Sequence, residues 1–402
     1  MLRGSPMVKV GIDAIGFYTS PYCLDLKTLA EARGIDVNKF YVGLGQEKMA
    51  VIPPDEDVVT MAADAGYRVL KQIDPKSIDT LLFATESAID QSKAAGMFVH
   101  RLLGLPERCR VLEIKQACYG ATAAIQMALP MLREDPSKKI LVIASDVARY
   151  GLKSKGESSQ GGGAIALLLS QNPSILTIEP ESGFYTEDLM DFWRPNYTEE
   201  AIVDGQYSCE VYLKLVQKTW EQYTALSGRT LIDHAHICYH VPVPRLVEKA
   251  HQHLLKINGA SKLSNIALKK ALEPALAYGR ITGNCYTAAL YLSFLSLLEN
   301  SPSDLSGKRI GFYSYGSGCM GEFFSGVVQA GYQDSLDKEG HQKMLSERQL
   351  LSQAEYENFY NFHYPNDGAK LVLASYGQGR YRLSGIDQHK RIYEASTACI
   401  SD

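Results

Sequence analysis

The sequence has no long apolar run and no strong excess of charge of either sign. Because no stretch of about 18 consecutive apolar residues occurs, we expect no membrane-spanning helix. The formal net charge is −4 over 402 residues, so the sequence does not predict a basic surface for nucleic acid. The first six residues, Met1–Pro6, lack the apolar core of a signal peptide. We therefore expect a cytoplasmic protein, with its natural start at Met7.

Paired cysteine motifs are also absent. The eight cysteines form no C-x-x-C pair, which argues against structural zinc and against a disulfide framework in a chain of this length. They are Cys23, Cys109, Cys118, Cys209, Cys238, Cys285, Cys319 and Cys399. Gln160–Gly163 is glycine-rich, but it is not followed by the Lys and Ser/Thr of a P-loop, and no Rossmann fingerprint occurs. We expect free thiols and no nucleotide-binding loop of either type.

What the sequence does contain is an alternation of short apolar runs with helical patterns, which is typical of an α/β protein. The expected strands are 80–85, 111–115, 140–145, 164–169, 236–240, 309–314 and 323–328. The expected helices are 90–103, 120–132, 213–226 and 288–298. From Asp334 onward the sequence is polar and predicts only one weak strand, 381–386.

Cys118 lies where the strand 111–115 passes into the helix 120–132. Free backbone N–H groups and the helix dipole favour negative charge at such a position, so we expect this thiol to ionise more readily than a free one. Small neighbouring residues leave room for a substrate. The arrangement suits a nucleophile that forms a thioester, and the alternative is a buried structural cysteine.

A short internal similarity suggests two related halves. Cys118 opens one Ala-rich helix, and Asn284-Cys-Tyr-Thr-Ala-Ala opens another in the second half. In this alignment Asn284 and Cys285 match Ala117 and Cys118, so Cys285 is the competing nucleophile. Chance similarity of two Ala-rich helices is the alternative.

Two further residues can transfer protons. Glu86 follows a buried strand, where a low dielectric raises a carboxyl pKa toward that of a useful base; otherwise it is a capping or surface carboxylate. His240 ends another strand and can be a general base or an electrophile, or else a core histidine. His234, His236 and His240 share one strand face but lack zinc spacing, so we expect no metal site.

Two segments can bind a substrate. Tyr315–Gly318 places Ser317 between two glycines, which lets backbone N–H groups approach an oxyanion; a plain glycine turn is the alternative. Arg245 and Lys249 are four residues apart, on one face of a helix if the segment is helical. They either bind phosphates or form a solvated surface pair.

Taken together, these motifs resemble the hydroxymethylglutaryl-CoA synthase family. The characteristic stretches include Ala84-Thr-Glu-Ser-Ala-Ile-Asp90, Glu113-Ile-Lys-Gln-Ala-Cys-Tyr-Gly-Ala-Thr122 and Tyr315-Gly-Ser-Gly-Cys-Met-Gly-Glu322. The others are 148–152, 185–188, 191–195, 203–205, 239–242 and 283–287. Each stretch alone is weak evidence for the family, but the occurrence of all of them in this order, from Val8 to about Gly331, is specific for it.

The resemblance implies a thiolase-like duplicated α/β fold with five layers, α-β-α-β-α, in a homodimer. The halves would be 7–172 and 173–402. Cys118 would carry the acetyl group, Glu86 would deprotonate its methyl, and His240 would act as acid/base at the acetoacetyl carbonyl. The implied acyl-binding residues are Tyr150, Ser159, Ser208, Asn284, Tyr315 and Ser317, and the CoA-binding residues are Arg245 and Lys249.

The implied reaction condenses acetyl-CoA, acetoacetyl-CoA and water to (S)-3-hydroxy-3-methylglutaryl-CoA in the mevalonate pathway, without a cofactor. The sequence departs from the family at Ser158 and Ser159, where Pro-Thr is usual, at Gly162, where Ala is usual, and at Glu248, where some bacterial members have Lys.

Three alternatives stay open. Other thiolase-fold enzymes pair the nucleophile with histidines, and Glu86 argues against them. A β-branching synthase acting on polyketide carrier-protein thioesters shares Glu86, Cys118 and His240, but the basic pair favours CoA. A non-catalytic acyl-CoA-binding protein would not need all three reactive residues.

Overall fold

The first half of the protein folds around one side of a nine-stranded mixed sheet. The computed structural model describes residues 8–71 and 73–396. The strands of this half are, in spatial order, β1 (Val10–Tyr18), β7 (Gly161–Gln171), β6 (Ile140–Ala148), β4 (Thr80–Ala84) and β5 (Arg110–Ile114). β1, β7 and β6 pair antiparallel, whereas β6, β4 and β5 pair parallel.

The second half repeats this arrangement. Its strands are β8 (Leu176–Thr186), β13 (Met320–Val328), β12 (Arg309–Gly316) and β11 (His236–Tyr239), again antiparallel, antiparallel and then parallel. β1 and β8 join the two halves, with Gly11 opposite Thr177. A Cβ at Gly11 would lie 2.0 Å from the Leu176 carbonyl oxygen, so the junction requires glycine. The predicted duplication is therefore present in the fold.

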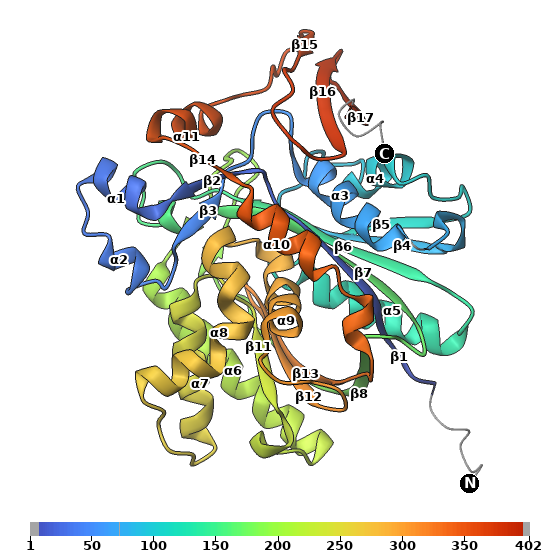
Figure 1. Ribbon diagram of the computed structural model, residues 1–402, viewed down its shortest axis with the longest axis vertical. Coiled ribbons are helices and arrows are strands. Elements are labelled where there is room, and N and C mark those ends of the chain that lie inside the picture. The colour runs from blue at the N-terminus through green and yellow to red at the C-terminus, as the bar shows by residue number, and fades with distance from the viewer. Residues whose placement is uncertain (1–7, 72, 397–402) are drawn as a thin grey trace.

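Helices complete the five layers. The central layer consists of α5 (Gly120–Glu134), α8 (Asn265–Thr282) and α9 (Ala289–Asn300), which share one apolar core with both halves of the sheet. The outer helices of the first half are α3 (Val58–Leu70) and α4 (Ala95–Leu102). Those of the second half are α6 (Gly205–Ser227) and α7 (Pro244–Ile257), as Figure 1 shows. The predicted thiolase-like layering is confirmed.

The continuous apolar runs of the strands follow from this layering. Alternate side chains of a strand point to opposite faces, and both faces are covered by helices. Along β6, Val142 packs in the central core, whereas Leu141 and Ile143 pack against the helices of the outer layer. The first five positions of β6, 140–144, are therefore all apolar.

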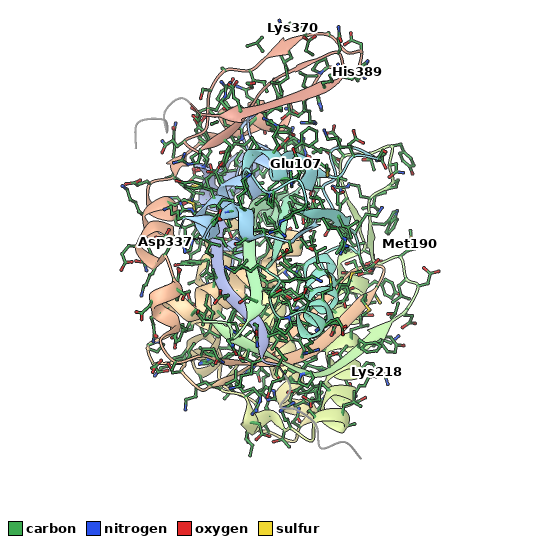
Figure 2. All side chains as sticks on the ribbon, turned by 90° about the vertical axis from the view of Figure 1, so that its right-hand side faces the viewer. Glu107, Met190, Lys218, Asp337, Lys370 and His389 are labelled. Atoms are coloured by element: carbon green, nitrogen blue, oxygen red, sulfur yellow. The ribbon has the colours of Figure 1, made fainter. Side chains whose placement is uncertain are left out.

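The tail after Asp334 is structured, contrary to the sequence-based expectation of one weak strand. It contains α10 (Lys338–Ser346), β14 (Gln349–Leu350), α11 (Gln353–Tyr360), β15 (Leu371–Val372), β16 (Tyr381–Asp387) and β17 (Lys390–Ala395). β15–β17 form a separate small sheet, at the top of Figure 1, and Figure 2 shows Lys370 and His389 at its outer end. Short apolar segments separated by polar ones gave too weak a periodic signal to predict these elements.

The remaining elements are peripheral. β14 pairs with β2 (Tyr22–Asp25), which pairs with β3 (Lys48–Ala50). α1 (Leu26–Arg33) and α2 (Asn38–Tyr41) follow β2, and the small pair β9 (Phe192–Trp193) and β10 (Ile202–Val203) precedes α6. Met190, before β9, lies at the outer edge of the molecule in Figure 2.

Most predicted elements are present, with shifted ends. The helix expected over 90–103 begins only at Ala95, and α6 begins eight residues before the expected 213. Seven cysteines are free, while Cys399 and residues 1–6 lie outside the described residues. In the described ranges, no helix is long and apolar enough to span a membrane.

Candidate active site

Cys118 and Glu86 lie in direct contact. Cys118 follows β5 and precedes α5, and Ala117 before it has a left-handed backbone, with φ +43°, which is uncommon for a residue other than glycine. The sharp turn leaves the Cys118 thiol partly accessible, and its Sγ donates to Oε1 of Glu86 over 3.0 Å. The structure thus brings together two residues that are 32 positions apart in the sequence.

The expected lowering of the Cys118 pKa is wrong. Burial raises the pKa of this thiol, and the negative charge of Glu86 and the hydrogen bond to it raise it further. A helix N-terminus carries only about half a positive charge, which a full negative charge in contact with the thiol outweighs. Cys118 therefore rests as a thiol and needs a base to ionise it.

Glu86 has the properties of that base. Burial raises its pKa to about 8 and the Asp146 charge contributes to the rise, whereas the hydrogen bond from Cys118 and the charge of Arg194 oppose it. The carboxyl can therefore accept and release a proton near neutral pH, which a carboxyl group with an ordinary pKa cannot do efficiently. The expectation from its place after a buried strand agrees with this environment.

Asp146 is a central residue that the sequence reasoning missed. It lies on β6, is fully buried, and accepts hydrogen bonds from Thr85 Oγ1 (2.8 Å) and from the Glu86 backbone N–H (2.9 Å). Its other oxygen accepts from the backbone N–H and the hydroxyl of Thr287. Asp146 therefore fixes the backbone of Glu86 relative to the second half of the molecule. A carboxylate inside an apolar run was the only signal in the sequence.

The second half contains a turn equivalent to that of Cys118, but at a different register from the one expected. Tyr286 has φ +44°, and α9 begins at Ala289. Counting from the left-handed residue, Thr287 is the counterpart of Cys118, and Cys285 lies two residues too early. Cys285 is fully buried, and burial raises its pKa to about 12.

His240 lies at the end of β11, the counterpart of the strand before Glu86. Its side chain is 2% exposed and stacks on Tyr315, and Nδ1 has no hydrogen-bond partner among the described residues. Burial lowers its pKa to about 3, so the imidazole is neutral at physiological pH. Tyr212 donates to the His240 carbonyl oxygen. Tyr315, on which His240 stacks, precedes Gly316, which packs against Gln116 and Tyr119 on either side of Cys118.

The other two histidines of the predicted face have different surroundings. His234 contacts the Tyr223 hydroxyl and the Thr230 carbonyl oxygen, and burial lowers the pKa of both His234 and His236. Among the residues that the structure describes, no group of three His, Cys, Asp or Glu side chains has the geometry of a metal site.

Three of the predicted acyl-binding residues lie together. Asn284 Nδ2 donates to the Tyr150 hydroxyl over 3.4 Å, and the Asn284 backbone N–H donates to the Ser159 carbonyl oxygen. The Tyr150 ring contacts Phe192 and Tyr286, two aromatic residues not identified from the sequence. Burial and a Cys118 thiolate both raise the Tyr150 pKa, so its hydroxyl is a stable donor beside the nucleophile.

Of the other three predicted residues, Ser208 and Tyr315 contact Asp191, a second buried carboxylate, and Ser317 precedes a third donor to it, Gly318. Ser208 Oγ and the Tyr315 hydroxyl donate to Asp191 Oδ2, and the Gly318 N–H donates to Oδ1. The Ser317 carbonyl oxygen accepts from Gln116, next to the nucleophile turn. A Cβ at Gly316 would lie 2.5 Å from the Gln116 carbonyl oxygen, so glycine is required here.

The basic pair on α7, Arg245 and Lys249, does not form a phosphate-binding site with both cations unpaired. Arg245 Nη1 bonds Glu248 Oε2 at 2.5 Å, and Arg280 also approaches Glu248, at 3.7 Å. Lys249 is exposed, and its charge opposes part of the rise that burial causes in the pKa of Cys209. The structure therefore places both side chains on the surface, with Arg245 already paired.

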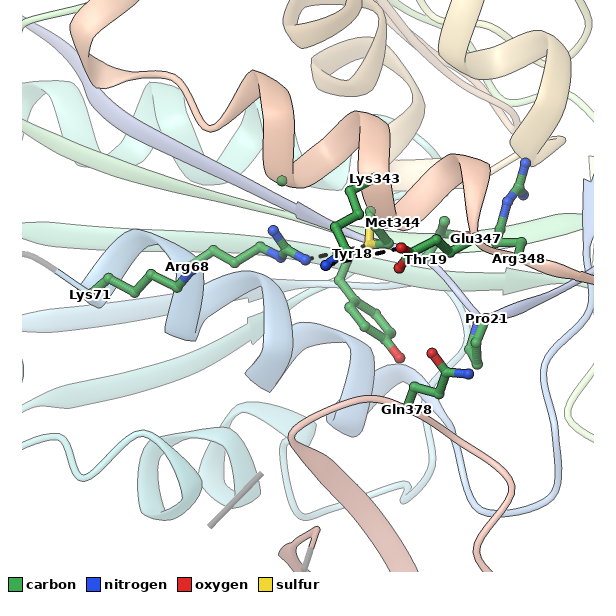
Figure 3. Close-up of a pocket in the computed structure, with 11 residues that line it drawn as sticks. Tyr18, Thr19, Pro21, Arg68, Lys71, Lys343, Met344, Glu347, Arg348 and Gln378 are labelled. Atoms are coloured by element: carbon green, nitrogen blue, oxygen red, sulfur yellow. Dashed lines mark hydrogen bonds and ion pairs between the residues drawn. The ribbon is translucent and has the colours of Figure 1, made fainter. Parts of the chain in front are cut away.

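A cavity of about 310 Å³ lies elsewhere. Figure 3 shows it between Arg68 of α3, Lys343 and Met344 of α10, and Gln378 of the tail. None of the predicted site residues lines it.

Comparisons with known proteins agree with these motifs. The family model "Hydroxymethylglutaryl-coenzyme A synthase N terminal" matches residues 6–174, and the C-terminal model matches 177–262 and 256–395. Hydroxymethylglutaryl-CoA synthase of Enterococcus faecalis is 42% identical, over 96% of this chain and 99% of its own. A crystal structure of HMG-CoA synthase complexed with CoA superposes with a TM-score of 0.91 at 39% identity, covering 96% and 100%. The polyketide biosynthesis 3-hydroxy-3-methylglutaryl-ACP synthase PksG of Bacillus subtilis is 35% identical, over 87% and 88%.

Proposed function

This chain belongs to the hydroxymethylglutaryl-CoA synthase family, and from this premise we propose that it condenses acetyl-CoA with acetoacetyl-CoA and water. The products are (S)-3-hydroxy-3-methylglutaryl-CoA and free CoA, in the mevalonate pathway. The observation that carries the proposal is the 3.0 Å contact between the Cys118 thiol and the Glu86 carboxyl. It joins a nucleophile to a base whose pKa is about 8.

The first step transfers the acetyl group. Glu86 accepts the thiol proton as Cys118 Sγ attacks the carbonyl carbon of acetyl-CoA. The new thioester bond forms, the bond to the CoA sulfur breaks, and the departing thiolate takes the proton. Glu86 is then again a carboxylate, ready for the second step.

The second step forms the carbon–carbon bond. Glu86 removes a proton from the acetyl methyl group, and backbone N–H groups of Cys118 and Ser317 are the proposed donors to the enolate oxygen. The carbanion adds to the C3 ketone of acetoacetyl-CoA. The N–H of neutral His240 forms a hydrogen bond to the ketone oxygen as the carbon–carbon bond forms. The resulting alkoxide takes up the proton that Glu86 removed from the methyl group, so Glu86 returns to its carboxylate form and the step is balanced.

Water then hydrolyses the Cys118 thioester and releases the product. These steps transfer only acyl groups and protons, so we propose that no metal or redox cofactor takes part. Tyr150, Ser159, Asn284 and the residues around Asp191 would hold the acyl groups.

The carrier-protein alternative has less support, because the polyketide relative is less similar than the CoA-dependent one. An assay of CoA release with acetyl-CoA and acetoacetyl-CoA, with product identification by mass, tests the proposal. Formation of hydroxymethylglutaryl-CoA supports it. Turnover only with carrier-protein thioesters would overturn it in favour of β-branching.

We also propose a homodimer through β5. This strand is the outer strand of the sheet, and its residue Leu112 is 48% exposed. Met97 of α4 and Met127 of α5 are exposed on neighbouring helices. Pairing of β5 with a second copy would cover the open edge. We place this dimer in the cytoplasm and keep 7–172 and 173–402 as its two halves.

A further inference from the structure

The helix α11 of the C-terminal tail holds the loop that carries Tyr150. This loop, residues 149–160, connects β6 to β7. In Figure 1, α11 lies at the upper left, and it contacts α1. The proposed mechanism gives α11 no role.

One hydrogen-bond chain runs from α11 to the backbone of Tyr150. The hydroxyl of Tyr356 accepts from Gln160 Nε2 at 2.8 Å, and Gln160 Oε1 accepts from the Tyr150 N–H at 3.0 Å. Tyr356 and Gln160 are 2% and 4% exposed. A single amide group therefore connects the tail to Tyr150, and with water excluded, nothing readily replaces either bond.

An ion network fixes the same side of the loop. Tyr356 also donates to Glu157, which accepts two hydrogen bonds from Arg33 of α1, at 2.7 and 2.9 Å. Arg33 donates to Glu357 of α11 as well. Because Glu157 and Arg33 are buried, loss of one partner would leave an uncompensated charge, which is costly.

The other side of Tyr150 is held by the end of α11. Arg149 Nη2 donates to the Tyr360 carbonyl oxygen at 2.6 Å, and its guanidinium stacks on the Tyr360 ring at 4.1 Å. Contacts from α11 thus reach the loop both before and after Tyr150.

We propose that α11 positions Tyr150 in the acyl-binding site, and that Tyr356 is a positioning residue that acts through Gln160. The inference rests on the proposed function, in which Tyr150 contacts the acyl group beside Cys118.

The test compares Tyr356→Phe with Tyr393→Phe. Both are buried tail tyrosines whose hydroxyl donates to a buried carboxylate, Glu157 and Asp57 respectively. Only Tyr356 connects to the Tyr150 loop. Hydrogen exchange, read by mass spectrometry, should become faster in the peptide spanning 149–160 in Tyr356→Phe and stay unchanged there in Tyr393→Phe.

Kinetics complete the test. Tyr356→Phe should lower kcat/KM about tenfold, the scale of one buried hydrogen bond, whereas Tyr393→Phe should leave it within about twofold. The loss should not add to that of Tyr150→Phe in the double variant, because both changes act through the same phenol. Unchanged exchange at 149–160, or fully additive losses, would overturn the inference. If the wild type forms no hydroxymethylglutaryl-CoA, the exchange comparison still decides the positioning role, and only the proposed function fails.

Discussion

The two halves of the molecule place the same kind of turn before equivalent central helices, but only one turn presents a nucleophile. Ala117 and Tyr286 have nearly identical left-handed backbones, φ +43° and +44°. The residue after each differs: Cys118 is partly accessible and contacts Glu86, whereas Thr287 is 1% exposed and bonds Asp146. A duplicated backbone therefore supplies the geometry twice, and in the proposed function accessibility together with one charged neighbour decides which copy reacts.

The duplication also explains the pair of proton-transfer groups. Glu86 follows β4, and His240 follows β11, the equivalent strand of the second half. In the proposed mechanism, one half thus contributes the base for the acetyl group, and the other contributes the group at the ketone. Asp146 connects both halves, because it binds Glu86 and Thr287 with different oxygens.

The largest expected effect separates the two cysteines near these turns. Cys118→Ala should lose turnover by roughly four orders of magnitude or more, because the covalent route has no substitute. Cys285→Ala should keep turnover within about an order of magnitude, since only packing changes. Incubation of the wild type with acetyl-CoA should add an acetyl mass to the Cys118 peptide, and an acetyl group on the Cys285 peptide would reverse the assignment.

The second prediction tests Glu86, the charged neighbour of Cys118. Glu86→Gln should form acetyl-enzyme more slowly but still detectably, because the glutamine cannot accept the thiol proton and water must do so instead. The variant should condense slower by roughly two to four orders of magnitude, the usual scale of general-base loss. The matched control is Glu56→Gln: burial raises the Glu56 pKa to about 8 as well, but Glu56 bonds Tyr18 in another part of the molecule.

The same variant should change thiol reactivity in the opposite direction. Removing the negative charge lowers the Cys118 pKa, so iodoacetamide should alkylate Glu86→Gln faster than the wild type at pH 8. Slower alkylation together with normal condensation would remove Glu86 from the mechanism.

The third prediction concerns pH. The base must be ionised, so condensation should rise with pH through about 8 and be about a hundredfold slower at pH 6 than at pH 9. Because the folded pKa lies above the unfolded one, protonated Glu86 stabilises the fold at low pH, and this stabilisation is lost as the pH rises through about 8. Single-turnover rates across this range should lose their pH dependence in Glu86→Gln.

The fourth prediction concerns the turn of the second half, in which Thr287 takes the place of Cys118. Thr287→Val leaves a buried Asp146 oxygen without its hydroxyl donor, so the free energy of unfolding should fall by about 1–3 kcal/mol. Condensation should slow about tenfold, because Asp146 also holds Glu86. Thr177→Val is the control, since the buried Thr177 hydroxyl has no partner among the described residues and its loss should cost little. Equal stability of the two variants in thermal or urea unfolding would show that the second turn does not support the first.

The sequence indicated which residues could react, and these roles stay predictions, but it did not indicate their surroundings. Glu86 and His240 each follow a buried apolar run, whereas Cys118 follows the partly exposed edge strand β5, and strand ends are visible in the sequence. The predicted alignment of the second turn with the first was wrong. It matched Asn284 and Cys285 to the first turn by helix composition, whereas the left-handed backbone at Tyr286 defines where the second turn lies.

Two kinds of information were missing from the sequence. The Cys118 pKa depends on a contact across 32 positions, which no local pattern contains. Asp146 and Asp191 bind partners from distant segments, so their importance emerges only after folding. The helices and most strands of the tail were not predicted, because these short elements are stabilised by contacts such as those of Tyr356 and Tyr393 with distant carboxylates.

The smallest expected effect concerns binding, which again distinguishes the halves. Arg245 and Lys249 follow His240 in the second half, and we propose that they contact the phosphates of CoA. Exposed charge pairs contribute only about 0.2–1 kcal/mol each, so reversing both to Glu should raise the KM for CoA substrates by only about a few-fold to tenfold. Acetyl transfer from a saturating pantetheine thioester should change much less, because that donor lacks the nucleotide phosphates.

Glu248→Gln releases Arg245 from its ion pair and should leave the KM unchanged or lower it. Added salt should weaken CoA binding to the wild type more than to the double variant, as screening acts on exposed charges. A double variant with the same loss for both donors would show that the pair is a solvated surface feature, and CoA recognition would then depend on other residues.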